Sequence, residues 1–226
     1  MANSARDGRI IDGRIGDLLA GIVPRHRKAW QKYLAALQAE LGGIERDLAS
    51  LPDESWAALK GNILRQIDQR RPEHSWPQVC DLLHEARAYR YLTELGCTEI
   101  HFSSPSMLAK SPDLTARLGA QTVLCEVKTI NIATPDPRGL LSHVIFKKLA
   151  SRLKDACNQL MAHEQNRSAQ RIIYIVINVR HGRDDSLTTH ITQMKMVAAK
   201  VLQADTQIVF DLASGRNADI NIADLP

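Results

Sequence analysis

The spacing of apolar residues near the N-terminus predicts helices. Tryptophan, leucine and isoleucine recur every three or four positions over residues 30–48, which is the pattern of an amphipathic helix with one buried stripe. Gly42-Gly43 falls inside this segment, and glycine is a poor helix former, so a bend or break is expected there. A second helix is expected over residues 54–69, with Asp53 as its N-cap. Residues 1–75 are therefore predicted to form a helical region.

After residue 77 the pattern changes to alternating helices and strands. A helix is predicted over residues 77–95, and Gly96 is expected to end it. The elements expected next are strands at 99–103, 113–118 and 121–130, a helix at 140–163, a strand at 171–179, a helix at 189–204 and a strand at 207–212. This order predicts an α/β fold for residues 76–226, with one mixed central sheet flanked by helices on both faces.

The predicted strand at residues 121–130 carries two charged residues inside an apolar run. Successive side chains of a strand point to opposite faces, so Glu126 and Lys128 share one face. Cys125 and Val127 point the other way, into an apolar layer. Burying a charged side chain is unfavourable unless the charge is paired or bound to a metal, so the position of these two residues indicates an ion pair or a metal site. The alternative is a surface hairpin on which Glu126 and Lys128 form a solvated pair.

The residues before this strand make the pattern more specific. Pro112-Asp113 is followed by twelve residues and then by Glu126-Val127-Lys128. Either short motif alone is common by chance, but only this Pro-Asp pair opens a predicted strand that a short turn joins to a strand with Glu-x-Lys. The combination resembles the signature of the PD-(D/E)XK nuclease superfamily, the restriction-endonuclease-like fold. The resemblance implies a core of a helix, a three-stranded meander, a helix and a fourth strand, as predicted over residues 77–179. It says nothing about the N-terminal helices.

The resemblance also implies a chemistry. Asp113 and Glu126, with the carbonyl of Val127, would hold Mg²⁺ or Mn²⁺, because carboxylate oxygens are hard ligands that suit these ions. The cation would polarise a phosphate and lower the pKa of a bound water. Lys128 would orient that water or stabilise charge on the phosphate oxygens. Whether Lys128 also acts as the general base is left open.

Two further residues are candidates for the catalytic site. Glu85 falls inside the apolar stripe of its predicted helix, so its carboxylate is expected to face the sheet. In the resembling family the first core helix often supplies such a glutamate near the metal. The alternative is a glutamate at the rim of the stripe, paired with Arg90 or with an upstream basic residue. Gln159 lies on the second core helix, from which part of the superfamily places a Gln or Lys near the phosphate.

Candidate nucleic-acid contacts are basic. Lys148 and Arg152 belong to a polar stripe of the helix predicted over residues 140–163. A solvated helix face explains this stripe without any function, and that explanation is favoured for Arg152. The run Arg25-His26-Arg27-Lys28 could contact phosphates, which requires charge but no particular sequence, or could simply be the start of an exposed helix. The formal net charge of +4 permits a polyanionic partner without requiring one.

Composition excludes several classes of protein. The 226 residues are 44% hydrophobic and 24% charged, as in globular proteins, and suffice for one domain with an extension or two small domains. No apolar run approaches the roughly 20 residues that cross a bilayer, and no signal peptide is expected. The four cysteines are scattered, which predicts reduced thiols in a cytoplasmic protein rather than a disulfide framework or a zinc site. No phosphate-binding loop with the spacing of ATP-driven motors is present.

The sequence therefore predicts a cytoplasmic nuclease that depends on Mg²⁺ or Mn²⁺. DNA is favoured over RNA as the partner, and a restriction or repair type endonuclease is expected, because most of the resembling family cleaves DNA; this step rests on analogy. The apolar stripe of the N-terminal helices is expected to pack on the nuclease core or on a second subunit, so a homodimer is allowed. No membrane partner is expected. The alternatives are a catalytically inactive nuclease-fold module that binds nucleic acid or protein, and an unrelated α/β domain with a coincidental motif.

Overall fold

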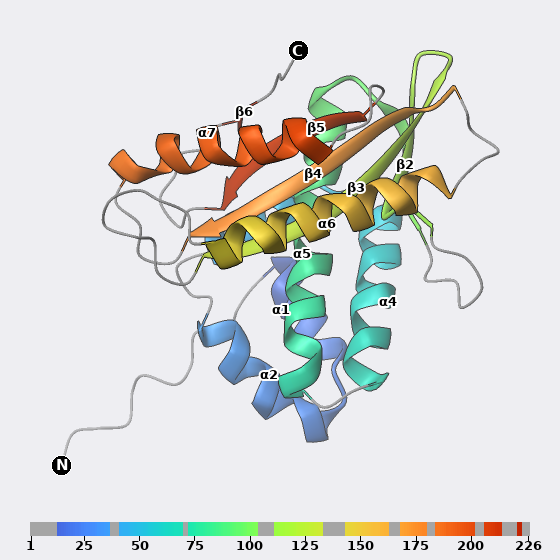
Figure 1. Ribbon diagram of the computed structural model, residues 1–226. Helices are drawn as coiled ribbons and strands as arrows, with labels where there is room; N and C mark the ends of the chain where they lie inside the picture. Colours follow the sequence, from blue (N-terminus) through green and yellow to red (C-terminus); the bar gives the residue numbers. More distant parts are fainter. Residues whose placement is uncertain are drawn as a thin grey trace.

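The chain folds as an α/β protein with helices on both faces of one mixed sheet, preceded by N-terminal helices (Figure 1). The computed structural model describes residues 13–36, 41–69, 72–103, 111–132, 143–162, 168–179, 184–201, 206–213 and 221–222. Within these ranges, no helix has both the length and the apolar character needed to cross a membrane.

Five longer strands form the sheet in the order β1–β2–β3–β4–β5, and the two-residue β6 is added beside β5. Their bounds are β1 (Thr98–Phe102), β2 (Leu114–Leu118), β3 (Gln121–Ile132), β4 (Gln170–Val179), β5 (Thr206–Ala213) and β6 (Asn221–Ile222). The first three strands make an antiparallel meander, whereas β4 and β5 run parallel to β3. Gly119, with a φ of 58°, supplies the left-handed residue of the tight turn between β2 and β3. The ends of the five predicted strands agree with the structure to within two residues.

Different parts of the chain cover the two faces of the sheet. Helices α6 (His143–Met161) and α7 (Asp184–Val201) pack on one face, in a core that includes Leu124 and Ile130 of β3. Helix α5 (Pro72–Glu94) packs on the other face, in a core that includes Val123, Cys125 and Val127. In the view of Figure 1, α6 crosses in front of the sheet and the N-terminal helices lie below it. The alternation predicted along β3 is confirmed. Helix α7 begins earlier than the predicted residue 189, with acidic residues at its N-terminus, where they are favourable.

Within the described residues, four helices precede α5. They are α1 (Gly13–Gly21), α2 (Pro24–Ala36), α3 (Leu41–Ala49) and α4 (Asp53–Gln69). The stripe expected on one helix is divided between α2 and α3, and residues 37–40 lie outside the described residues. Trp30 is buried in the same apolar core as the α5 face of the sheet, and Leu41 packs against that core. The N-terminal helices therefore pack on the part of the chain that carries the sheet. The side chains of Leu34 and Leu37 lie outside the described residues.

Helix α5 is longer than the sequence indicated. It begins at Pro72 rather than at residue 77, so the linker expected over residues 70–74 is wrong for its last three residues; the first two lie outside the described residues. The reason is positional, because a proline at the first helical residue replaces an N–H that has no partner there anyway. Gly96 ends the helix as predicted, with a φ of 87°. One continuous helix thus crosses residue 75, where two regions were expected to meet.

Candidate active site

The candidate site lies beside β3 at the point where β2 starts. Asp113 directly precedes β2, whose first residue, Leu114, pairs with Cys125. The next contact between the two segments is made by a side chain, because Oδ2 of Asp113 accepts a hydrogen bond of 2.7 Å from the backbone N–H of Val127. The N–H and C=O of one strand residue point to the same edge of the strand, so the carbonyl of Val127 also faces Asp113. Two kinds of oxygen ligand thus meet at this edge.

Glu126 and Lys128 lie on the α6 face of β3 and form an ion pair between Oε1 and Nζ. Glu126 is completely buried, with 0% of its surface exposed. Its second oxygen, Oε2, has no hydrogen-bond partner within the described part of the chain. Burial, followed by the repulsion of the Asp113 carboxylate, raises the pKa of Glu126 to about 8. The charge and hydrogen bond of Lys128 and a hydrogen bond from the Asp113 backbone oppose this rise without cancelling it.

The neighbours of Glu126 are electrostatically linked to it. Burial raises the pKa of Asp113, although the charge of Lys128 and the hydrogen bond from Val127 oppose that shift. Burial lowers the pKa of Lys128, but the Glu126 and Asp113 carboxylates outweigh burial, and the pKa is raised overall. Lys128 consequently stays protonated between two acidic groups.

Helix α5 brings Glu85 to the same place from the other face of the sheet. The Glu85 side chain is buried. Burial, and then the charges of Asp113 and Glu126, hold the pKa of Glu85 well above its usual range. The charges of Asp113 and Glu126 therefore reach Glu85 across the strand. The alternative pairing with Arg90 is not observed, because Arg90 pairs with Asp47 and Glu94.

Asp81 belongs to the same cluster, although it was not among the residues predicted for the site. It precedes Glu85 by one turn of α5. Burial raises the pKa of Asp81, while a hydrogen bond with Thr129 and the charges of three basic residues oppose the shift. Those residues are Arg152, Lys128 and Lys148. The signal was present in the sequence, since residues four apart share one face of a helix, and Glu85 had already marked that face.

Helix α6 borders the site with the polar stripe noted in the sequence. Nε2 of Gln159 donates a hydrogen bond of 2.6 Å to the carbonyl of Ser111, in the segment that leads into β2. Gln159 therefore holds this segment in place. Arg152 is half-buried and Lys148 is exposed, and both lie near enough to Asp81 for their charges to lower its pKa. The stripe places two cations beside the acidic cluster.

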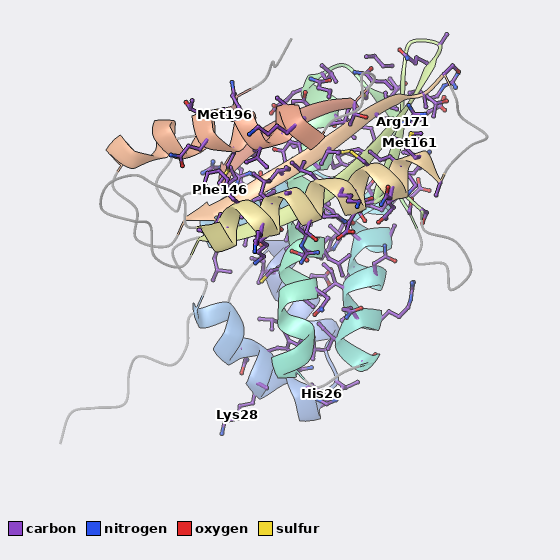
Figure 2. All side chains as sticks on the ribbon, viewed as in Figure 1. His26, Lys28, Phe146, Met161, Arg171 and Met196 are labelled. Carbon is purple, nitrogen blue, oxygen red and sulfur yellow. The ribbon has the colours of Figure 1, made fainter. Side chains whose placement is uncertain are left out.

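The basic run near the N-terminus has a different environment. Nη2 of Arg27 donates hydrogen bonds to the carbonyls of Ala20 and Ile22, at 3.3 and 3.2 Å, and so stabilises the end of α1. Lys28 is exposed at the end of the helical layer that lies away from the sheet (Figure 2). The side chain of Arg25 lies outside the described residues.

The ligand atoms of the site suit a hard cation. Carboxylate and carbonyl oxygens are what Mg²⁺ and Mn²⁺ prefer, and the unpartnered Oε2 of Glu126 has capacity for one. Within the described ranges, no three Asp, Glu, His or Cys side chains are grouped closely enough to hold an ion by themselves. A Mg²⁺ site commonly uses only one or two carboxylates and completes its shell with water and phosphate. Asp113, Glu126 and the carbonyl of Val127 fit that smaller set.

No protein-family model matches the chain, and no curated protein or solved structure matches it significantly.

Proposed function

We propose that the chain is a divalent-metal-dependent nuclease that hydrolyses phosphodiester bonds, specifically a cytoplasmic DNA endonuclease of restriction or repair type. The observation that carries the proposal is the state of Glu126. Its carboxylate is fully buried on a central strand, and Oε2 lacks a hydrogen-bond partner among the described residues. A buried carboxylate is costly unless it is paired or bound to a metal, and the contact with Lys128 satisfies only Oε1. A cation shared with Asp113 would satisfy both residues.

The arrangement of elements supports membership of the PD-(D/E)XK superfamily. The order α5, β1, β2, β3, α6, β4, with β1 to β3 as a meander, is the order that the resemblance implies. The two helices pack on opposite faces of the sheet. Asp113 stands at the start of the second strand, and Glu126 and Lys128 stand in the middle of the third. The motif and the order of the elements therefore support the same proposal.

Each site residue has a role in this proposal. Asp113 and Glu126, with the carbonyl of Val127, bind Mg²⁺ or Mn²⁺. When bound, the cation polarises the scissile phosphate and lowers the pKa of a coordinated water. Lys128, which stays protonated beside Glu126, stabilises the negative charge that develops on the phosphate oxygens. Glu85 and Asp81 border the acidic side of the site, where they hold water or approach the cation directly.

The nucleic-acid backbone is proposed to lie on the α6 side of the site. Lys148 and Arg152 are the cations that lie near the acidic cluster there, and such contacts give affinity without reading sequence. Gln159 supports the interface indirectly, because it fixes the segment before Asp113. The basic run on α2 is left out, since Arg27 is engaged with the end of α1. The preference for DNA over RNA rests on the family resemblance alone.

Incubation of the protein with supercoiled plasmid, linear DNA and a matched RNA tests the proposal. We expect nicking or linearisation of the plasmid with Mg²⁺ or Mn²⁺, and none with chelator. Glu126→Gln, which keeps the shape of the side chain and removes its charge, should abolish cleavage. Cleavage that persists in this variant or in chelator would reject the proposed site. A wild-type protein that binds Mn²⁺ and DNA but cleaves neither nucleic acid would instead be an inactive binding module.

A further inference from the structure

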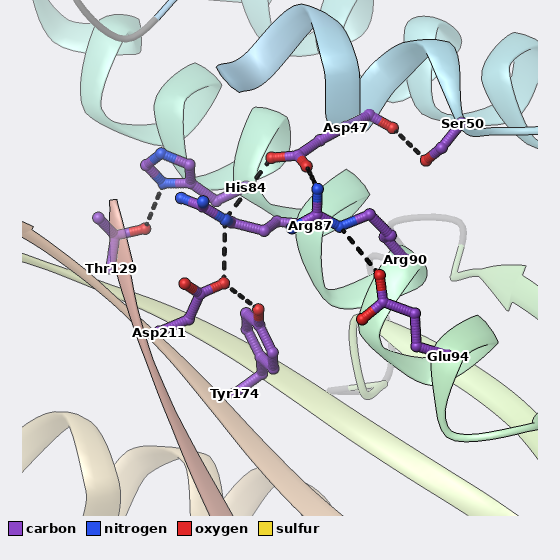
Figure 3. Close-up of polar contacts among 9 residues, drawn as sticks. All are labelled: Asp47, Ser50, His84, Arg87, Arg90, Glu94, Thr129, Tyr174 and Asp211. Carbon is purple, nitrogen blue, oxygen red and sulfur yellow. Dashed lines mark hydrogen bonds and ion pairs between the residues drawn. The ribbon is translucent and has the colours of Figure 1, made fainter. Parts of the chain in front are cut away.

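A buried network of ion pairs joins the N-terminal helices to the sheet through α5 (Figure 3). Nε of Arg87 on α5 lies 2.9 Å from Oδ2 of Asp211 on β5 and 3.6 Å from Oδ2 of Asp47 on α3. Tyr174 on β4 donates its hydroxyl to the same oxygen of Asp211. Arg90, on the following turn of α5, pairs with Oδ1 of Asp47 at 2.8 Å. One aspartate of α3 therefore binds two arginines of α5.

The members of this network are largely removed from water. Asp47 is 3% exposed, Asp211 is 6% exposed and Arg87 is 8% exposed. Burying charges is unfavourable unless their pairing geometry is good, and apolar contacts could cover the same area without that cost. Arg87 keeps both carboxylate partners only while α3, α5 and β5 hold their present spacing. The network thus specifies a position of α5 more than it adds stability.

The network holds the side of α5 that faces away from the acidic cluster. Successive residues of an α-helix are about 100° apart, so Arg87 lies about 200° around the helix axis from Glu85. Between them, Nδ1 of His84 lies 3.0 Å from Oγ1 of Thr129 on β3. Helix α5 is consequently attached to β5, to β3 and to α3 by separate polar contacts. Its rotation about its own axis is fixed by residues that do not belong to the candidate site.

We infer that Asp47 is a positioning residue for the cation site, because it sets the rotation of α5 and thereby the places of Glu85 and Asp81. The inference rests on the proposed function, since the cation site is what Asp47 positions. A rotation of only about 20° moves a group ~6 Å from the helix axis by about 2 Å. Functional sites tolerate displacements of only about 0.5 Å, so a small loss of restraint is enough to weaken the site. Through Asp47, the N-terminal helices therefore affect the geometry of the cation site, although they supply no residue to it.

The test compares Asp47→Asn with a matched control, Glu94→Gln. Each variant replaces one of the carboxylates that pair with Arg90 by the corresponding amide. Glu94 differs from Asp47 because its side chain is 59% exposed and its pair with Arg90 joins two residues of the same helix. Mn²⁺ affinity of the full-length protein is measured by isothermal titration calorimetry, at a temperature where circular dichroism shows each variant folded. We expect Asp47→Asn to bind Mn²⁺ on the order of ten-fold more weakly, as for other residues that orient metal ligands, and Glu94→Gln to bind as wild type. A merely structural Asp47 would lower the melting temperature and leave the affinity unchanged.

A second variant covers the case in which Asp47→Asn does not fold. Tyr174→Phe removes only the hydroxyl that orients Asp211 and leaves every charge of the network in place. We expect a few-fold loss of Mn²⁺ affinity for this variant. Wild-type affinity in the folded variants overturns the positioning role and leaves the proposed nuclease standing. Absence of Mn²⁺ binding by the wild-type protein overturns both.

Discussion

Oδ2 of Asp113 lies 2.7 Å from the backbone nitrogen of Val127 and accepts its hydrogen bond. Leu114 and Cys125 form the last residue pair at this end of the β2–β3 ladder. The hydrogen bond from Val127 to Asp113 lies directly beyond that pair, so a side-chain carboxylate continues the ladder just before β2 begins. Asp113 thus has two duties that can be separated, one as a hydrogen-bond acceptor and one as a charged ligand. An asparagine oxygen can perform the first duty but is a much poorer substitute in the second.

Asp113→Asn is therefore expected to stop cleavage without unfolding the protein. We expect plasmid cleavage in Mg²⁺ to fall by at least about 100-fold, the size of effect seen when one electrostatic group of an active site is removed. The melting temperature in chelator should stay the same or rise, because burial and the charge of Asp81 already disfavour the charge on Asp113. A drop of several degrees with cleavage retained would show that Asp113 is a structural residue only.

Glu126→Gln and Lys128→Ala should change DNA affinity in opposite directions when metal is absent. Above a pH of about 8, where Glu126 is charged, removing the carboxylate takes away repulsion between Glu126 and the phosphates, whereas removing the lysine takes away an attraction. We expect equal or tighter binding for Glu126→Gln, and weaker binding for Lys128→Ala with a salt slope reduced by about 1. Fluorescence anisotropy with a short duplex in chelator measures both, and Lys154→Ala, at an exposed position outside the polar stripe of α6, is the control. Unchanged affinity in both variants would mean that the pair does not face phosphate.

Stability should depend on pH through Glu126. Its pKa is raised to about 8 in the folded protein, against 4.5 for an ordinary glutamate. Folding thus favours the protonated form, so the metal-free protein is expected to lose stability as the pH rises from about 5 to about 8. Mn²⁺ should restore more stability at the upper end of this range, because the cation takes the place of the proton.

Melting temperatures at several pH values, with Mn²⁺ and with chelator, check this expectation. Glu126→Gln has no carboxylate to titrate at this position and should give a flatter profile in chelator. A wild-type protein that gains stability in chelator as the pH rises across this window would contradict the buried, partly protonated state of Glu126.

A chain that begins at residue 76 is expected to fail as an independent unit. It would lack helices α1 to α4 and the first turn of α5, and it would leave Arg87 without Asp47. The loss would also expose the apolar residues of α5 that the N-terminal helices help to bury, such as Leu83. We expect association in light scattering and no cooperative melting, whereas the full chain melts in one transition. A monomeric fragment with a sharp melting transition would show that the N-terminal helices are dispensable for folding.

Local periodicity was sufficient to place the central residues of the site. Alternation along a strand puts Glu126 and Lys128 on one face whatever the rest of the chain does, and the helical period puts Glu85 beside the sheet. The position of Asp113 followed from the short turn at Gly119, which fixes how β2 is paired with β3. These features depend on neighbours in sequence, so the sequence reveals them.

The remaining features depend on contacts between distant elements. Asp81 joins the cluster through distant elements, because the charges of Arg152 on α6 and Lys128 on β3 act on its carboxylate. Asp47 and Asp211 meet at Arg87 from opposite ends of the chain, and no local pattern distinguishes them from ordinary surface charges. The sequence pattern placed the start of α5 too late because proline was read as a helix breaker. At the first residue of a helix, proline is tolerated, and α5 begins at Pro72.

The two layers that cover the sheet are synthesised at different times. Helices α1 to α5 leave the ribosome before any strand, whereas α6 and α7 emerge between the strands that they join. The early helices supply Trp30, Leu48 and Leu59 to an apolar core that also includes residues of the strands, so this core is complete only once the sheet is present. The strands are synthesised in the same order in which they stand side by side in the sheet. Glu85 is synthesised before β3, so the acidic cluster becomes complete only when β3 is present.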